Sequence, residues 1–245
     1  MKSERFRLHA RDFLGTPDGK KHFNEKHFAE SAPRYDIATR GLSLFQDRSW
    51  KRQLIAALPD LEDPTCVDVA CGTGDVTFML ADRYGEGAFI GVDLTAEMIE
   101  IARQRNLCSK TRFICGDMCN LPMHDATVDL ITGSYAIRNA PDLRDALMEY
   151  RRVLKPGGTL AILDFCKPDS RVLQRIQFQL LRFWGGLWGL LLHANPEVHG
   201  YISKSLQSFP DARSLQRIYV DAGFRLIHSR RHFGGMMMQT LLVKA

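Results

Sequence analysis

The sequence lacks the features that mark secreted, metal-binding and membrane-spanning chains. Its six cysteines form no Cys-x-x-Cys pair, and we expect them to stay unpaired in a reducing, cytoplasmic compartment. Charged residues interrupt the start of the chain, so we expect no secretory signal there. The longest apolar run, residues 183–192, is about half of the roughly 20 residues that a membrane-spanning helix needs. Cys and His form no cluster that predicts a metal site, and no metal is expected.

The length of 245 residues and the composition favour one globular α/β domain, and the charge distribution favours a basic arm before it. Residues 1–52 hold 12 Lys/Arg against 7 Asp/Glu, whereas the remainder holds 21 of each. We expect residues 1–30 to form a basic arm with at most one helix, and residues 31–245 to form the domain. Such an arm could meet an anionic membrane surface, nucleic acid or an acidic partner, or could simply be solvated.

Hydrophobic patterning predicts a Rossmann-like, seven-stranded, mostly parallel, doubly wound sheet, because strands alternate with helices along most of the chain. Residues 31–58 have helical periodicity and are expected to form a lid, and residues 170–208 to form a helical cap. The last two apolar runs flank Gly234 and Gly235, which predicts an antiparallel hairpin. The predicted strands are residues 66–70, 88–93, 112–115, 128–133, 159–165, 224–228 and 236–243.

A glycine loop follows the first predicted strand and leads directly into a helix. Gly72 and Gly74 allow a tight turn against which a nucleotide can lie, and Thr73 stands between them. The third glycine of the dinucleotide fingerprint G-x-G-x-x-G is absent. The loop therefore indicates a nucleotide-type ligand other than a standard dinucleotide.

Three further residues follow successive strands in the order that an adenosine-containing ligand requires. Asp93, next to Leu94, ends the second strand, where a carboxylate can accept both ribose hydroxyls. Asp117 follows the third strand, where it could accept from an adenine amino group, and Ser134 follows the fourth, near the reactive end. Together with the incomplete fingerprint, this order favours S-adenosylmethionine as the cofactor, leaving S-adenosylhomocysteine as product.

From about residue 28 to 235 the chain resembles the UbiE/MenG family of quinone-biosynthesis C-methyltransferases. The run Ile137-Arg138-Asn139 and Lys167-Pro168 are more discriminating than the glycine loop, which all such enzymes share. The matching segments are residues 32–36, 43, 50–52, 67–75, 134–139, 152–158, 164–168, 201–205 and 209–210.

The resemblance implies which residues contact the cofactor. Thr73, Asp93, Asp117, Met118 and Ser134 match the family's contact positions, and Tyr35 is expected to close over the cofactor. Departures from the family pattern bear on the acceptor more than on the cofactor. They are Thr39, Phe45, Tyr135, Ala136 and the segment 234–239.

The chemistry of ring methylation suggests roles for Arg138 and Asn139. A ring carbon attacks well when a neighbouring hydroxyl loses its proton, so the site needs a base or a stabiliser of phenolate charge. Arg138 is a poor proton acceptor, and we expect it to lower the pKa of the acceptor hydroxyl while Asn139 orients the oxygen. The alternative is structural: Arg138 pairs with an acid, and Asn139 caps the helix that contains Asp142.

Three residues are candidates for the proton acceptor, namely His193, His199 and Tyr201. The cap aromatics Phe178, Phe183, Trp184 and Trp188 could line a channel for a prenyl tail, or could form the core of the cap itself. Met236–Met238 could add an adaptable wall.

Several functional interpretations stay open. The first is C-methylation of a quinol or phenolic ring, with or without a prenyl tail, of the demethylmenaquinol or ubiquinone-precursor type. Others are a natural-product methyltransferase on the same framework and a catalytically silent, cofactor-binding scaffold. Nucleic acid is not an expected partner, because residues 134–137 lack the Asn/Asp-Pro-Pro-aromatic sequence of amino-group methylators. A homodimer and peripheral membrane contact are further hypotheses.

Overall fold

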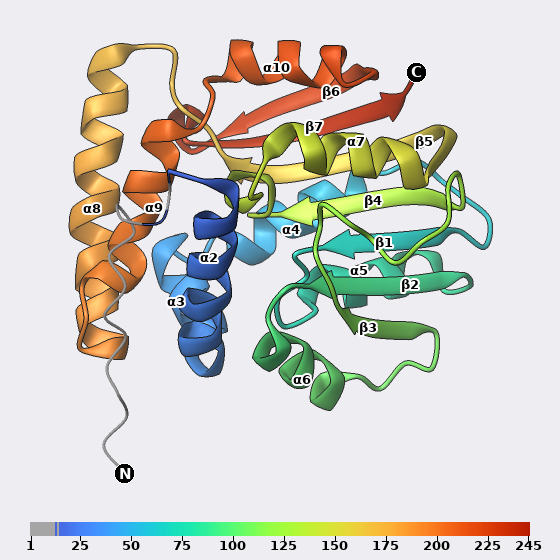
Figure 1. Ribbon diagram of the computed structural model, residues 1–245, viewed down its shortest axis with the longest axis horizontal. Helices are drawn as coiled ribbons and strands as arrows, with labels where there is room; N and C mark the ends of the chain where they lie inside the picture. Colours follow the sequence, from blue (N-terminus) through green and yellow to red (C-terminus); the bar gives the residue numbers. More distant parts are fainter. Residues whose placement is uncertain (1–12, 14) are drawn as a thin grey trace.

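A seven-stranded sheet forms the centre of the computed structural model, which describes Phe13 and residues 15–245 apart from the side chains of Glu197 and His199 (Figure 1). Its order is β3-β2-β1-β4-β5-β7-β6. The first five strands are parallel, and β7 runs antiparallel to both β5 and β6. The predicted fold class and C-terminal hairpin are therefore confirmed. The strands are β1 (Thr65–Val69), β2 (Ala88–Asp93), β3 (Thr111–Cys115), β4 (Val128–Ser134), β5 (Leu154–Phe165), β6 (Phe224–His232) and β7 (Met237–Lys244).

Helices cover both faces of the sheet because neighbouring strand residues point to opposite sides. Leu130 on β4 packs with α4 (Asp47–Ala56) and α5 (Asp75–Tyr84), whereas the next residue, Ile131, packs with α7 (Leu143–Val153) and α10 (Ala212–Asp221). Another helix, α6 (Ala96–Arg105), packs against β2 and β3. Parallel strands buried on both faces explain why the sequence shows continuous apolar runs there.

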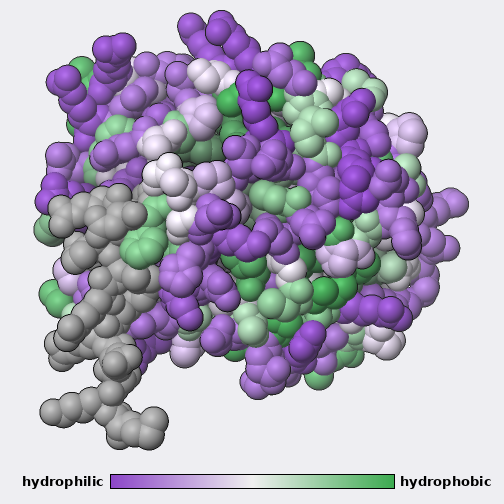
Figure 2. Space-filling view, in the orientation of Figure 1, coloured by the Kyte–Doolittle hydropathy of each residue, from purple (hydrophilic) through white to green (hydrophobic). Residues whose placement is uncertain are grey.

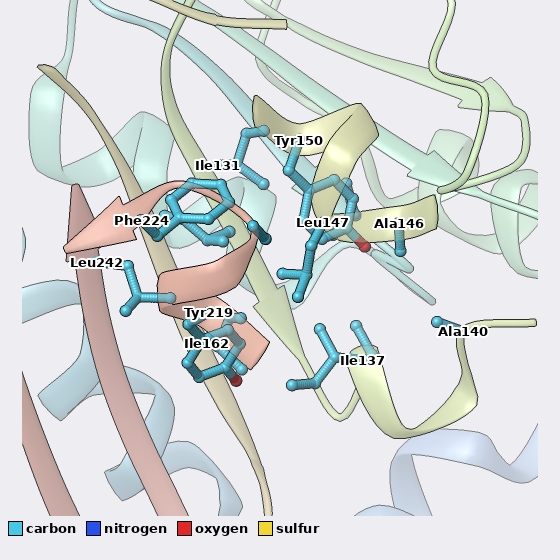
Figure 3. Packing of buried hydrophobic residues seen from close by; sticks show 14 of the residues in the cluster. Ile131, Ile137, Ala140, Ala146, Leu147, Tyr150, Ile162, Tyr219, Phe224 and Leu242 are labelled. Carbon is cyan, nitrogen blue, oxygen red and sulfur yellow. The ribbon is translucent and has the colours of Figure 1, made fainter. Parts of the chain in front are cut away.

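One buried cluster fixes a short 3-10 helix at the carboxyl edge of the sheet. This helix, η2 (Ile137–Asn139), places Ile137 among Leu147, Tyr150 and Ile162 (Figure 3). Burying a side chain of this size stabilises a fold by about 1.5–3 kcal/mol. Anchoring Ile137 therefore also fixes the residues that follow it, Arg138 and Asn139.

Residues 17–30 of the expected basic arm form the one helix that was allowed there, and this helix packs against the domain. Helix α2 (Pro17–Ser31) begins after Thr16, whose hydroxyl accepts a hydrogen bond from the Gly19 amide at 3.1 Å. Phe23, Asn24 and His27 on this helix are buried. The first twelve residues of the predicted arm lie outside the described part of the chain.

The predicted lid and cap are both helical and contact one another. The lid continues through η1 (Ala32–Arg34) and α3 (Tyr35–Leu42), and the cap consists of α8 (Arg171–His193) and α9 (Glu197–Ser208) (Figure 1). Gly41 on α3 accepts a hydrogen bond through its carbonyl from Trp184 Nε1 on α8, at 3.1 Å. Within the described residues, no helix is both long and apolar enough to cross a membrane.

Candidate active site

The glycine loop joins β1 to α5, and its backbone requires glycine. Gly74 has φ of 91°, and a Cβ there would come within 2.9 Å of the Phe113 ring. Gly72 has φ of 55° and faces Tyr35, whose ring would be 3.4 Å from an added Cβ. Side chains are strained in this region of φ, so both positions favour glycine. The loop therefore presents bare backbone beneath Tyr35.

A buried carboxyl group, Asp68, stabilises the strand that precedes the loop. It accepts hydrogen bonds from the hydroxyls of Thr77, at 2.9 Å, and Thr132, at 2.8 Å. These bonds tie β1 to α5 and β4. Burial raises the pKa of Asp68 to about 6, although the two hydroxyls oppose the shift.

Asp93 ends β2 and connects it to the glycine loop. One carboxylate oxygen accepts from the Gly72 amide at 2.9 Å, and the other accepts from the Thr95 amide at 2.9 Å. Burial raises the pKa of Asp93. A carboxylate has about four lone-pair sites, so Asp93 can still accept from ligand hydroxyls while it holds the loop.

Asp117 follows β3 and contacts helix α2. Asp117 accepts from the Cys119 amide at 2.9 Å and pairs with Lys21 of α2 at 2.6 Å. The ion pair and hydrogen bond raise the pKa of Lys21. Helix α2 is therefore linked electrostatically to the position expected to receive an adenine.

Ser134 supplies the observation that tests the fit of the cofactor. Its Oγ is buried and has no hydrogen-bond partner in the described protein, although it lines the same cavity as Asp93 and Asp117. A buried hydroxyl without a partner is costly unless a ligand satisfies it. An extended ligand with polar groups at both ends, such as S-adenosylmethionine, fits this arrangement.

The structure brings most of the predicted cofactor residues into one cavity. Thr73 and Gly74 are the exceptions. Thr73 is buried and donates its hydroxyl hydrogen bond to Asp36 at 2.7 Å, and Gly74 precedes α5 as its N-cap. Those that line the cavity are Tyr35, Gly72, Asp93, Leu94, Asp117, Met118 and Ser134.

A second, apolar cavity adjoins the first, and four side chains line both of them. These shared residues are Phe28, Tyr35, Tyr135 and Asn139. The second cavity contains about 910 Å³ of empty space, part of it open to solvent. Its other walls come from the lid, the cap and the C-terminal turn, which contribute Trp50, Leu181, Tyr201, Ile202, Met236 and Met237 among others. We call it the acceptor cavity.

Arg138 lines the acceptor cavity and is 4% exposed. Its Nε lies 3.5 Å from Asp164 and its Nη1 donates to Ser205 Oγ at 2.5 Å. The guanidinium also lies over the rings of Phe165 and Tyr201. The pairing with an acid that was the structural alternative is thus present, while the charge remains at the cavity wall.

Asn139 does not cap the following helix. Asp142 does so, accepting from the amides of Arg144 and Asp145 at 2.7 and 3.1 Å. The Asn139 side chain instead donates to the Tyr135 carbonyl at 3.1 Å and accepts from the Tyr201 hydroxyl.

Of the three predicted proton acceptors, Tyr201 lines the acceptor cavity and His193 does not. The side chain of His199 lies outside the described residues. Sequence reasoning missed His27, Asn24 and the cavity-facing role of α2. The sequence pattern gave little indication that these residues are buried, because charged residues surround the few buried positions of this helix.

The aromatic residues of the cap that could have lined a channel for a prenyl tail lie outside the lining of the acceptor cavity. Phe178, Phe183, Trp184 and Trp188 do not line the acceptor cavity, and Phe183 is 72% exposed. The cap instead contributes Leu181, Tyr201 and Ile202. Of the three methionines predicted to form a wall, Met236 and Met237 line the acceptor cavity.

Within the described residues, no three His, Cys, Asp or Glu side chains gather to hold a metal ion. His228 and His232 have the His-x-x-x-His spacing, but they lie on strand β6. Residues four apart on a strand are separated by about 13 Å, in contrast to one turn of a helix.

Solved structures share this fold, and two of them illustrate the similarity. An S-adenosylmethionine-dependent methyltransferase from Aquifex aeolicus is 20% identical, with a TM-score of 0.58, over 84% of this chain and 93% of that one. Geranyl diphosphate C-methyltransferase from Streptomyces coelicolor was solved with Mg²⁺, geranyl diphosphate and S-adenosylhomocysteine. It has a TM-score of 0.60 and is 16% identical, over 81% of this chain and 80% of that one.

Sequence relatives are more similar. A demethylmenaquinone methyltransferase from Deinococcus radiodurans is 34% identical over 90% of this chain and 92% of its own length. A demethylmenaquinone methyltransferase from Thermus thermophilus is 33% identical over 84% of this chain and 95% of its own length. The sequence model of the ubiE/COQ5 methyltransferase family matches residues 18–244. The chain therefore belongs to the ubiE/COQ5 methyltransferase family and is an S-adenosylmethionine-dependent methyltransferase.

Proposed function

We propose that this enzyme methylates a ring carbon of a quinol of the demethylmenaquinol type. The observation that carries the proposal is the pair of adjoining cavities with Arg138 and Asn139 in the acceptor wall. A flat aromatic ring suits walls built from Tyr35, Tyr135 and Phe165. The relatives named for demethylmenaquinone support the same substrate class.

The cofactor would be held by Gly72, Asp93, Leu94, Asp117, Met118 and Ser134, with Thr73 and Gly74 shaping the loop and Tyr35 above it. When bound, it supplies a methyl group on a positively charged sulfur. The protein would hold the ring carbon in line with that group, which lowers the entropic part of the barrier. Arg138 favours the ionised acceptor hydroxyl through its charge, and Asn139 orients the oxygen.

The direct test is methyl transfer from labelled cofactor to a reduced demethylmenaquinone in detergent, followed by mass spectrometry and NMR. We expect a gain of one methyl group on a ring carbon. Cofactor binding without transfer to this quinol or to any compound in a lipid extract would support the silent-scaffold alternative instead.

A natural-product acceptor is the second candidate. Four positions that depart from the family pattern line the acceptor cavity, namely Thr39, Tyr135, Met236 and Met237. A phenol or prenylated compound of different shape would be favoured by changes at these positions. Methylation of another component of a small-molecule extract, with the quinol left unchanged, would support this candidate.

We propose further that the outer face of α8 contacts an anionic bilayer from which a prenylated acceptor is drawn. This face exposes Val172, Leu173, Ile176, Leu180, Phe183, Leu187, Leu190 and Leu191. The helix also carries Arg171, Arg175 and Arg182 and no acidic residue. Apolar side chains beside arginines match the boundary between acyl chains and anionic headgroups. The face of the molecule seen in Figure 2 is covered mainly by hydrophilic side chains, with smaller apolar patches between them.

A further inference from the structure

The proposed reaction requires a group that takes the proton of the acceptor hydroxyl. The described residues of the acceptor cavity include five titratable side chains: His27, Tyr35, Tyr135, Tyr201 and Arg138. Arginine keeps its proton in proteins. Burial raises the pKa of Tyr35 to about 12 and raises those of Tyr135 and Tyr201 as well, so these phenols stay protonated. Histidine is the member of this set that accepts a proton near neutral pH.

His27 has the position that this task needs. It is 4% exposed and lies on α2, with its ring 5.1 Å from the ring of Tyr201 and stacked 5.4 Å from Phe23. Tyr201 also lies beneath the Arg138 guanidinium, at 5.8 Å. One phenol ring therefore contacts both the imidazole and the cation.

Buried hydrogen bonds hold helix α2 in a fixed position beside Asn139, at the carboxyl edge of the sheet. Asn24, one turn before His27, donates a hydrogen bond from its amide to the Asn139 carbonyl at 2.6 Å. The Tyr201 hydroxyl contacts the side-chain oxygens of both Asn24 and Asn139. A movement of α2 would break these buried bonds, so the imidazole keeps its place in the wall.

A neutral imidazole is the form that accepts a proton, and aromatic rings pack against the imidazole of His27. These rings come from α2 (Phe23, Phe28) and from α9 (Tyr201). The charged side chain of the same cavity, within its described lining, is Arg138. Asp164 pairs with Arg138 and lies outside the lining of the acceptor cavity.

We propose that His27 is the general base that accepts the proton of the acceptor hydroxyl. The O–H bond breaks and its electron pair moves into the ring. The ring carbon then forms a bond to the methyl group, whose bond to sulfur breaks with both electrons remaining on sulfur. The hydrogen on the methylated carbon leaves as a proton, and the oxygen recovers its proton from the His27 imidazolium. The net products are the methylated ring, the demethylated cofactor and one proton.

The test compares His27→Gln and His27→Asn with His22→Gln, whose exposed histidine lies on the same helix outside both cavities. We expect kcat to fall about 100-fold or more in the His27 variants, with KM and cofactor affinity within about threefold. The kcat of these variants should recover as pH rises, because the hydroxyl then ionises unaided. Added imidazole should partly rescue His27→Ala.

A readout without cofactor separates this inference from the proposed function on which it rests. Bound 1-naphthol should ionise at lower pH in the wild type than in His27→Gln, as followed by the naphtholate absorbance. When 1-naphthol binds to the wild type, the histidine NMR signals should show that an imidazolium has formed. This measurement does not depend on the folding of a variant. Unchanged kcat, pH profile and naphthol titration in His27→Gln would overturn the role of His27. Failure of the quinol assay alone, with the titration difference intact, would overturn only the substrate.

Discussion

The hydroxyl of Thr73 in the glycine loop donates a hydrogen bond to Asp36 of the lid helix, 2.7 Å away. Arg105 joins the same contact, donating to the second Asp36 oxygen at 3.2 Å and to the Thr73 carbonyl at 2.9 Å. The loop that would hold the cofactor and the helix that would cover it are therefore connected directly. Closure of the lid and order in the loop should be coupled.

Replacing Asp36 with Ala should weaken cofactor binding. The change removes one hydrogen bond from Thr73 and one ion pair with Arg105, worth about 1 kcal/mol at a partly exposed position. We expect the dissociation constant of S-adenosylhomocysteine to rise about fivefold in calorimetry. Asp60→Ala, which removes a surface pair with Arg83, is the control. Equal affinity in both variants would show that the lid contact does not support the loop.

Arg138→Lys should lower kcat about 100-fold and leave cofactor affinity within threefold. Lysine keeps a charge near Asp164 but cannot reproduce the planar contacts with Phe165 and Tyr201. Ser205→Ala, which removes only the hydroxyl bonded to Arg138, should cost about tenfold or less. Loss of cofactor binding in Arg138→Lys would contradict the proposed role at the acceptor.

The buried carboxyl of Asp68 should make stability fall as pH rises. Its pKa is about 6 in the folded protein, against an ordinary value of 3.8, so the folded state binds more protons between these pH values. The stability present below about pH 4 is therefore lost progressively up to about pH 6. Between these pH values the free energy of unfolding of the wild type, measured in urea, should fall by about 3 kcal/mol more than that of Asp68→Asn. Parallel stability curves would argue against the shift.

Gly41→Ala should loosen the contact between lid and cap. An added Cβ would come within 2.2 Å of the Trp188 ring, so the helices must separate or the indole must move. We expect a loss of about 1–3 kcal/mol and a change in tryptophan fluorescence. Gly200→Ala on α9 is the matched control, because nothing lies within 4 Å of its Cβ position and alanine favours a helix.

Vesicle binding tests the proposed membrane face. The wild type should bind vesicles containing phosphatidylglycerol more strongly than neutral vesicles, and added salt should weaken this binding. Phe183→Ser with Leu191→Ser should reduce binding several-fold while cofactor affinity stays unchanged. Equal binding by the double variant, or a dimer that buries α8 in solution, would contradict this use of the face.

Residues that follow buried parallel strands were predictable, and those on surface helices were not. Asp93, Asp117 and Ser134 each follow an apolar run, and parallel strands bring such positions to one edge of a sheet. His27 lies in a helix whose buried positions are few and surrounded by charge, so periodicity gave no indication of its burial. The cap aromatics show the converse. Phe183 and Trp184 are strongly apolar, but how α8 docks against Gly41 decides which side faces the cavity.

The four side chains common to both cavities have a consequence for how this framework can change its substrate. Altering Tyr35 or Tyr135 disturbs the cofactor as well as the acceptor, because each lines both cavities. Thr39, Leu42, Leu181, Ile202 and Phe233 line the acceptor cavity alone. They lie on the lid, the cap and the turn between β6 and β7, all outside the strands. New acceptors can therefore be accommodated by remodelling these peripheral segments, while the sheet and its cofactor residues stay the same.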